Sequence, residues 1–387
     1  MSFFKDRNCY LKDYNLPIWE KIRRFNKVYL GLICLVVLIG LTILYSAGNG
    51  HFTPWASKQL IRFFMSLGIL VFVAMTNLRL WMKYAYVIYG LTLVMLIGVN
   101  LVGSIGMGAQ RWLDLGFFQL QPSEVMKIAL ILALARYFHS TTLEEIRGFK
   151  FMIPPMLMIL IPVGLILEQP DLGTAMMLVG VGTALCFLVG VQVWKFLLAG
   201  GLVAGAIPVL WHFLHDYQKQ RVLTFLNPES DPLGSGYHIL QSKITLGSGG
   251  LFGKGFLQGT QSHLSFLPEK QTDFIFTVLS EEFGLIGSLV LLFIYMAIIA
   301  YGFIIANRCT SFFGKMLAMG ITINFALYVF INMGMVMGLL PVVGIPLPLV
   351  SYGGTAMLTL FFGFGLVECV DINHEMVIGR RGSIDDE

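Results

Sequence analysis

The sequence predicts an all-α fold, a polytopic membrane helix bundle of about ten transmembrane helices with a long extracytoplasmic loop before helix 8. Three observations predict it. The mean hydropathy is +0.77. Only 12% of the 387 residues are charged, against roughly a quarter in soluble domains. Apolar runs of about 20 residues, long enough to cross the hydrocarbon core as a helix, recur along almost the whole chain.

Polar or glycine-rich segments separate these apolar runs and set the limits of each expected helix. Pro122 suits the first turn of the fourth helix, and Asp171 and Asp273 precede the sixth and the eighth. The eighth run is long enough to tilt or to extend beyond the bilayer. We place the spans at 28–47, 60–76, 84–103, 123–138, 151–167, 173–191, 196–213, 274–305, 316–338 and 354–370.

Charge distribution predicts that both termini are cytoplasmic. Residues 1–27 are too long and too rich in acids and aromatics for the n-region of a cleaved signal peptide, so we expect a retained tail. Of the 26 lysines and arginines, seventeen then fall inside and nine outside, as the positive-inside bias requires. The domains expected are the tail 1–27, a transmembrane domain 28–371 and a second tail 372–387. The net charge of +4 gives no ground for a nucleic-acid partner.

In this orientation the inner connections are short, whereas the outer ones are long and rich in Gly, Pro and polar residues, so function should face outward. The loop of about 214–273 is the longest. Loops of this length are usually functional or disordered, and this composition is not that of a disordered segment. The five cysteines show no metal-binding spacing, and no metal can be named from the sequence.

Two motifs near the outer mouths of the early helices carry charge. Arg111 and Trp112 in RWLDLG could clamp a diphosphate and an adjoining ring or lipid, although Trp112 could equally be an interfacial anchor. Glu124 and Lys127 in QPSEVMK are three residues apart on one helix face and can pair. Their pair either neutralises two buried charges or serves function, because ionisable residues inside a span are functional suspects.

Two further motifs have a structural and a functional interpretation. Asp171 in EQPDLGTA is either a helix N-cap or a polar group that holds a cation or a substrate sugar. LGSGGLFGKG fails as a nucleotide-binding P-loop, because Ser248 replaces the first glycine and Gly255 follows Lys254. Its amides and Lys254 could still cradle a pyrophosphate as an anion nest does.

The stretch FLPEKQTDFIFTVLSEEFG at 266–284 is the most informative. Asp273, Thr277 and Glu281 fall at i, i+4 and i+8 and should form one polar stripe that faces the bundle interior. Asp273 is the outermost of the three, where it is either an N-cap or a general base that substrate can reach. GIPLPLVSYGG at 344–354 cannot form a regular helix, so we expect a re-entrant element that offers Ser351 and Tyr352 to a cavity.

Together, GAQRWLDLG, QPSEVMK, QPDLGTA, LGSGG with GKG, LPEKQTDFIF with SEEFG, and PLPLVSYGG closely resemble the motifs of the SEDS family of bacterial membrane proteins. The resemblance covers nearly the whole chain, and within the family it is greatest to the RodA branch rather than to FtsW or SpoVE. It implies a peptidoglycan glycosyltransferase that polymerises lipid II on the outer face of the cytoplasmic (inner) membrane during cell elongation and releases undecaprenyl diphosphate.

The resemblance also implies roles for particular residues. The family's essential aspartate corresponds to Asp273, and its functionally important motif residues correspond to Arg111, Trp112, Glu124, Lys127 and Asp171. Expected partners are lipid II, the nascent glycan strand, membrane lipids, a class B penicillin-binding protein and other components of the rod complex. The family often has His where Lys270 or Gln271 stands here, so we assign no catalytic histidine.

The chemistry of the residues agrees with this activity. A diphosphate leaves readily once its charge is neutralised, so the second acid of a glycosidase is unnecessary and Asp273 alone can deprotonate the acceptor hydroxyl. Arg111, Lys243 and Lys254 are candidates for stabilising the departing diphosphate. A divalent cation, Mg²⁺ or Mn²⁺, is a candidate for the same task, and no organic cofactor is expected. The alternatives are a flippase for the same lipid-linked precursor and a structural scaffold.

Overall fold

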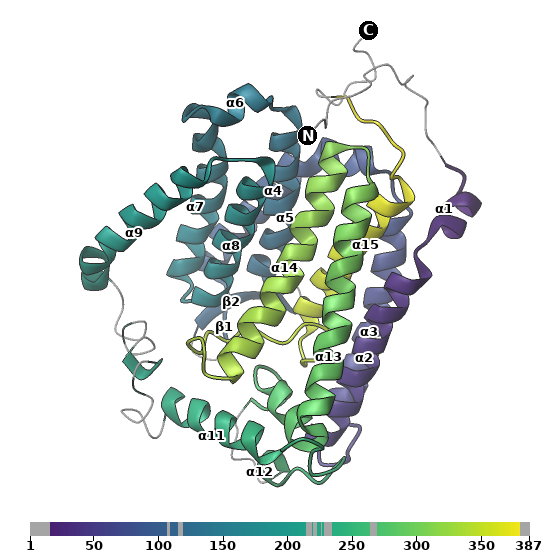
Figure 1. The fold of residues 1–387 in the computed structure, drawn as a ribbon, viewed down its shortest axis with the longest axis vertical. Coiled ribbons are helices and arrows are strands. Elements are labelled where there is room, and N and C mark those ends of the chain that lie inside the picture. The colour runs from purple at the N-terminus through teal and green to yellow at the C-terminus, as the bar shows by residue number, and fades with distance from the viewer. Residues whose placement is uncertain are drawn as a thin grey trace.

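The computed structural model describes residues 16–106, 109–114, 119–213, 219, 223–225, 227, 234–263 and 269–379. Each of the ten predicted spans falls on one helix of a membrane-type bundle (Figure 1). These helices are α2 (Lys27–Ala47), α3 (Trp55–Ala74), α4 (Leu78–Val102), α5 (Pro122–Ser140), α7 (Ile153–Glu168), α8 (Leu172–Val189), α9 (Val193–Phe213), α13 (Ile275–Arg308), α14 (Phe312–Val336) and α15 (Gly354–Ile372). Of the predicted tails, residues 16–27 and 372–379 are described.

Eight spans in the described part of the chain are long and apolar enough to cross a membrane, which confirms the predicted fold class of a multi-pass membrane bundle. The two remaining helices differ for opposite reasons. Almost every residue of α5 is buried, including Glu124 and Lys127, because it packs against α4, α14, α8, α7 and α15 at the centre of the bundle. In α9, large apolar side chains such as Leu197 and Leu202 stay exposed.

The two ends of the bundle differ in architecture. At one end, which we call the tail end, lie α1 (Ile18–Arg24), α6 (Leu143–Arg147), the 3₁₀ turn η1 (Lys150–Met152) and residues 373–379. Arg24 Nη1 donates to Glu375 Oε2 at 3.0 Å and Asn26 Nδ2 to Asp371 Oδ2 at 3.2 Å. These contacts place the first and last described segments at the same end, as an even number of spans requires.

The opposite end, the loop end, holds α11 (Ser235–Ser248), α12 (Thr260–His263) and residues 339–353 (Figure 1). It also holds a small antiparallel sheet that the sequence did not predict. Its strands are β1 (Ser104–Gly106), β2 (Ala109–Asp114) and β3 (Gln119–Leu120), in the order β1-β2-β3 between α4 and α5. Strands this short carry almost no periodicity, which is why the segment reads as loop.

The predicted eighth span is not a straight helix. α13 kinks at Gly284, whose φ of 66° and ψ of −160° are accessible essentially only to glycine. The freed backbone groups bond to the glycine-rich turn after α11, with Lys254 N donating to Glu281 O at 2.9 Å and Leu285 N to Gly250 O at 3.0 Å. The kink therefore separates a short helix, 275–283, from a longer one, 285–308.

Candidate active site

Asp273 lies in the turn that leads into α13, at the loop end. The N-cap of α13 is Phe274, which makes no side-chain cap hydrogen bond, so Asp273 stands one residue before the cap position. Its side chain is partly exposed. A Cβ added to Gly344, which has φ +73°, would lie 3.5 Å from Asp273 Oδ2. The carboxylate therefore faces the loop that precedes α15.

That loop, residues 339–353, is the non-helical element expected from its prolines and glycines. It is held against the segment before Asp273 by hydrogen bonds. Ser351 Oγ donates to Thr272 O at 2.5 Å, and Tyr352 N donates to Gln271 O at 2.9 Å. Leu347, Leu349 and Val350 are buried, so the loop has the protein cover that irregular backbone needs in a membrane. The structure thus brings Ser351 and Tyr352 beside the predicted base.

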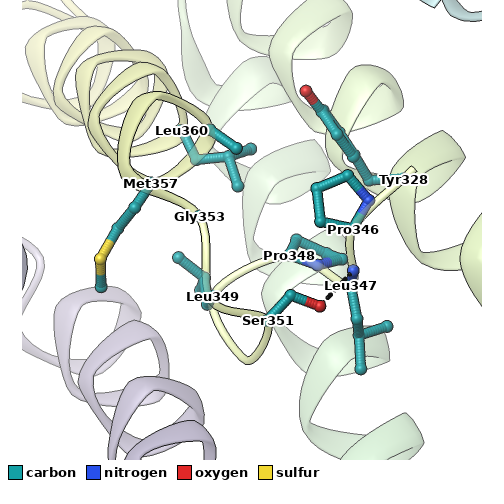
Figure 2. A pocket seen from close by; sticks show the side chains of 10 residues that line it. Tyr328, Pro346, Leu347, Pro348, Leu349, Ser351, Gly353, Met357 and Leu360 are labelled. Carbon is teal, nitrogen blue, oxygen red and sulfur yellow. Dashed lines mark hydrogen bonds between the residues drawn. The ribbon is translucent and has the colours of Figure 1, made fainter. Parts of the chain in front are cut away.

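A small cavity of about 10 Å³ lies between this loop, α14 and the start of α15 (Figure 2). Tyr328, Pro346, Ser351 and Leu360 are among its lining residues. Figure 2 also shows the hydrogen bond from Leu347 N to Ser351 Oγ, of 2.8 Å, that closes the turn. The volume is close to that of a single water. A sugar does not fit in this volume. In this cavity Ser351 therefore stabilises the loop through its hydrogen bonds.

Glu124 and Lys127 form the predicted pair, with 2.6 Å between Lys127 Nζ and Glu124 Oε1. Their side chains are only 6% and 2% exposed. The Tyr328 hydroxyl of α14 donates to Glu124 and accepts from Lys127, and Thr359 Oγ1 of α15 lies 3.4 Å from Glu124 Oε2. The network joins α5, α14 and α15 inside the bundle, and Tyr328 also lines the cavity beside the loop that faces Asp273.

Arg111 and Asp171 are brought together at the mouths of α5 and α8. Arg111 Nε donates to Gln169 O at 3.2 Å, and Arg111 Nη2 donates to Pro170 O. Asp171 is the N-cap of α8 and accepts from Thr174 N at 3.2 Å, which confirms its capping interpretation. Trp112 follows Arg111 on β2. Because neighbours on a strand point to opposite faces, the joint clamp by the pair stays a prediction.

The glycine-rich segment around Lys254 packs on the kink of α13. Lys254 Nζ lies 2.7 Å from Glu281 Oε1, and Gly255 N donates to Glu282 O at 3.0 Å. A Cβ on Gly253 would lie 2.1 Å from Glu282 O. These glycines thus permit close backbone packing, and the amides of Lys254 and Gly255 are used within the fold rather than presented as an anion nest.

Lys243 differs from the other predicted cations because its side chain is exposed. It lies on α11 and crosses Gly338, where an added Cβ would lie 2.8 Å from Lys243 Nζ. Gly338 begins the segment that continues into the loop over Asp273. Lys243 therefore reaches the same end of the bundle as the candidate base.

The sequence interpretation missed two buried amides that hold this site. Asn332 Nδ2 of α14 donates to Asp273 O at 2.9 Å and to Ile345 O at 2.7 Å, and Gln59 Nε2 of α3 donates to Ser351 O at 3.0 Å. Both residues are at most 1% exposed. A polar amide inside an apolar span was the available signal, but the sequence alone does not give its partner.

The described residues contain no group of three or more His, Cys, Asp or Glu side chains that could hold a metal ion. Asp273 is the acidic residue beside the loop over the site. Mg²⁺ in particular is often bound by one or two carboxylates together with substrate phosphates rather than by a full protein cage. A cation bound in that way would need only the Asp273 carboxylate from the described residues.

The fold and the site define a multi-pass membrane protein whose candidate chemistry lies at one end of the helix bundle. Residues 23–376 match the family model of cell cycle proteins named for FtsW, RodA and SpoVE. The chain belongs to this family, the SEDS family, as its motifs indicated.

Relatives and solved structures cover nearly the whole chain. The peptidoglycan glycosyltransferase MrdB of Escherichia coli K12 is 45% identical over 93% of this chain and 96% of its own. Stage V sporulation protein E of Bacillus subtilis is 36% identical over 86% and 93%. A chain from a peptidoglycan synthase complex of polymerization and crosslinking matches with a TM-score of 0.79 and 30% identity over 90% and 98%. The rod shape determining protein RodA of Thermus thermophilus matches with a TM-score of 0.68 and 28% identity over 90% of this chain and 97% of its own.

Proposed function

We propose that the protein is a peptidoglycan glycosyltransferase that polymerises lipid II into glycan strands. The observation that carries the proposal is Asp273, a partly exposed carboxylate fixed beside a buried re-entrant loop at one end of a membrane bundle. The similarity to MrdB, 45% over nearly the full length of both chains, supports this activity and favours it over the flippase alternative.

In the proposed reaction Asp273 removes the proton from the acceptor sugar hydroxyl. The hydroxyl oxygen then forms a bond to the anomeric carbon of the donor, and the bond from that carbon to the diphosphate oxygen breaks. The lipid diphosphate leaves with the bonding electron pair, and the proton stays on Asp273 until solvent takes it. One carboxylate is enough, because a diphosphate needs charge neutralisation and not protonation to leave.

The departing diphosphate needs positive charge, and the three predicted cations differ in availability. Arg111 is bonded to the carbonyls of residues 169 and 170, and Lys254 is paired with Glu281. The exposed Lys243 is therefore the cation that we favour for this role. A divalent cation held between Asp273 and the substrate phosphates would supply the same neutralisation.

We also propose the cellular setting that the charge distribution favours. The loop end, with Asp273, faces away from the cytoplasm of a bacterial inner membrane, and both termini are cytoplasmic. A class B penicillin-binding protein, a transpeptidase, is the proposed partner, together with other rod-complex components. The similarity to a chain of a peptidoglycan synthase complex supports such an assembly.

The test is a gel assay of labelled lipid II with the wild type, Asp273→Asn and the control Glu269→Gln, each co-purified with its cognate transpeptidase. Glu269 is an acid four residues upstream in the same turn, and it accepts from Thr272 Oγ1 at 2.9 Å. We expect long glycan strands from the wild type and the control and none from Asp273→Asn. Formation of polymer by Asp273→Asn would exclude Asp273 as the general base. Movement of lipid II across vesicles without polymer from any variant would favour the flippase.

A further inference from the structure

One amide group joins the candidate base to the re-entrant loop. Asn332 lies four residues from the end of α14, and its Nδ2 is 2.9 Å from Asp273 O and 2.7 Å from Ile345 O. The acceptors belong to segments that are far apart in sequence. Because the side chain is 0% exposed, water does not compete for either hydrogen bond, and both bonds are electrostatically stronger than they would be at the surface.

These two hydrogen bonds set the distance between the Asp273 segment and the re-entrant loop. Ile345 follows Gly344, the residue whose Cα faces the Asp273 carboxylate. Asn332 therefore holds the backbone of the base and the backbone of the loop opposite it on one rigid group. A shift of either carbonyl would move the carboxylate relative to the surface that it faces.

Asparagine is suited to this position by its donors. One nitrogen supplies two N–H groups to two carbonyls, whereas a leucine of similar size supplies none and a carboxylate would repel both. Asn332 Oδ1 is buried and has no hydrogen-bond partner among the described residues. An unsatisfied buried acceptor opposes folding, so the residue is hard to explain by packing alone.

We propose that Asn332 is a positioning residue that holds Asp273 at its working distance from the re-entrant loop. It does not contact the substrate, and it acts through the backbone of Asp273. The inference rests on the proposed function, because it assigns Asn332 a role in the reaction for which Asp273 is the base. It predicts a loss of turnover without a loss of substrate binding.

The experiment compares Asn332→Leu with Asn324→Leu in the complex with the transpeptidase. Asn324 lies two turns away on the same face of α14, is 5% exposed, and also has a buried amide oxygen that lacks a partner in the described structure. Both substitutions remove a buried amide from one helix face, but only the first touches the site. We measure kcat and KM for lipid II, the thermal midpoint, and the binding of labelled lipid II.

For Asn332→Leu we expect kcat to fall about 100-fold, the effect of an ångström-scale misplacement of a catalytic group. KM and lipid II binding should change less than about threefold, and Asn324→Leu should keep its kcat. A thermal midpoint that falls while the folded protein keeps wild-type kcat would reduce Asn332 to a structural residue. Equal loss of kcat in both variants would do the same.

The Asp273→Asn variant in the same assay separates this inference from the proposed function. If Asp273→Asn polymerises lipid II, the base assignment fails, whatever Asn332 does. If Asp273→Asn is inactive and Asn332→Leu is fully active, the base stands and the positioning role is overturned. The change Asn332→Asp should also lower kcat, because its carboxyl donates at most one hydrogen bond when protonated and none when ionised, so at least one of the two carbonyls loses its donor.

Discussion

At the residue scale, the pair Glu124–Lys127 shows what burial does to a charge. Removing one partner of a buried ion pair leaves an uncompensated charge and typically costs about 3–5 kcal/mol, whereas removing both is often nearly neutral. We therefore expect Lys127→Met to lower the thermal midpoint strongly. Glu124→Gln with Lys127→Met should recover most of it, since the Tyr328 hydroxyl can still donate to the amide oxygen that replaces the carboxylate at position 124.

The measurement is the thermal midpoint of the purified single and double variants in detergent, read beside lipid II polymerisation. A double variant as unstable as Lys127→Met would contradict the ion-pair account. Recovery of stability without recovery of polymerisation would show that the pair also serves the reaction, which is the role that the family resemblance implies.

Lys270 gives a pH prediction at the same scale. It is buried in the turn before Asp273, and burial lowers the pKa of its ammonium group below the ordinary value. Between the lowered pKa and about 10.5 the unfolded chain binds more protons than the folded one, so stability rises with pH across that window. At pH values below the pKa of Lys270 in the folded protein, the cost of burying its charged ammonium group lowers stability in full.

Lys270→Met lacks this titration. The thermal midpoint of the variant relative to the wild type should therefore be highest near neutral pH and should decline as the pH approaches 10, because only the wild type is relieved. A constant difference between Lys270→Met and the wild type from pH 7 to 10 would contradict the prediction.

At the scale of the element, the kink in α13 depends on one glycine. Gly284 has a backbone conformation that costs other residues about 1–3 kcal/mol, and an added Cβ would lie 2.4 Å from Gly253 N. Gly284→Ala should lower the thermal midpoint by several degrees. It should also reduce polymerisation, because the short helix 275–283 before the kink begins beside Asp273. The matched control is Gly68→Ala in α3, where an added Cβ meets nothing within 4 Å.

The control should be neutral or slightly stabilising, since alanine has the higher helix propensity. If Gly284→Ala is as stable and active as Gly68→Ala, the kink is not a requirement of the fold. Longer-chain lipid changes the packing of the protein against the membrane but does not relieve a clash between backbones. We therefore expect the activity of Gly284→Ala to stay reduced in longer-chain lipid.

The elements also show where sequence patterns stop being informative. The glycines of LGSGGLFGKG were interpreted as a phosphate cradle, because glycine-rich turns serve both to bind anions and to let two backbones approach. The structure shows the second use, with Gly249 and Gly253 against the carbonyls of Ser280 and Glu282. Composition does not distinguish the two, and the contact that decides it joins segments thirty residues apart.

For the molecule as a whole, hydropathy predicted a helix at each of the ten positions, because crossing a bilayer requires a length and a composition that few other segments have. The site was predicted in part. The non-helical loop at 344–354 was predicted from its prolines and glycines, and it lies against the segment just before Asp273. Asn332 and Gln59 were missed, because a single amide forms no local pattern and its partner lies on a loop segment distant in the sequence. That partner depends on how helices pack, which no local pattern encodes.

The last prediction concerns the orientation of the whole bundle, on which the proposed function depends. Lipid II polymerisation outside the cytoplasm requires the loop end to face outward. Phe252 is 79% exposed at the loop end, and Val377 is 48% exposed at the tail end. In a Cys9→Ser background, Phe252→Cys should react with a membrane-impermeant maleimide on intact spheroplasts. Val377→Cys should react only after the membrane is permeabilised.

Four other cysteines remain in that background, and the structure places each of them in a buried or partly buried position, so the Cys9→Ser protein alone supplies the baseline. The reverse labelling pattern would place Asp273 in the cytoplasm. Strand synthesis outside the cell by this carboxylate would then be impossible, and the activity proposed from the site would fail together with the orientation. Labelling of Phe252→Cys alone ties the partly exposed base, the re-entrant loop and the exposed Lys243 to the side on which glycan strands are assembled.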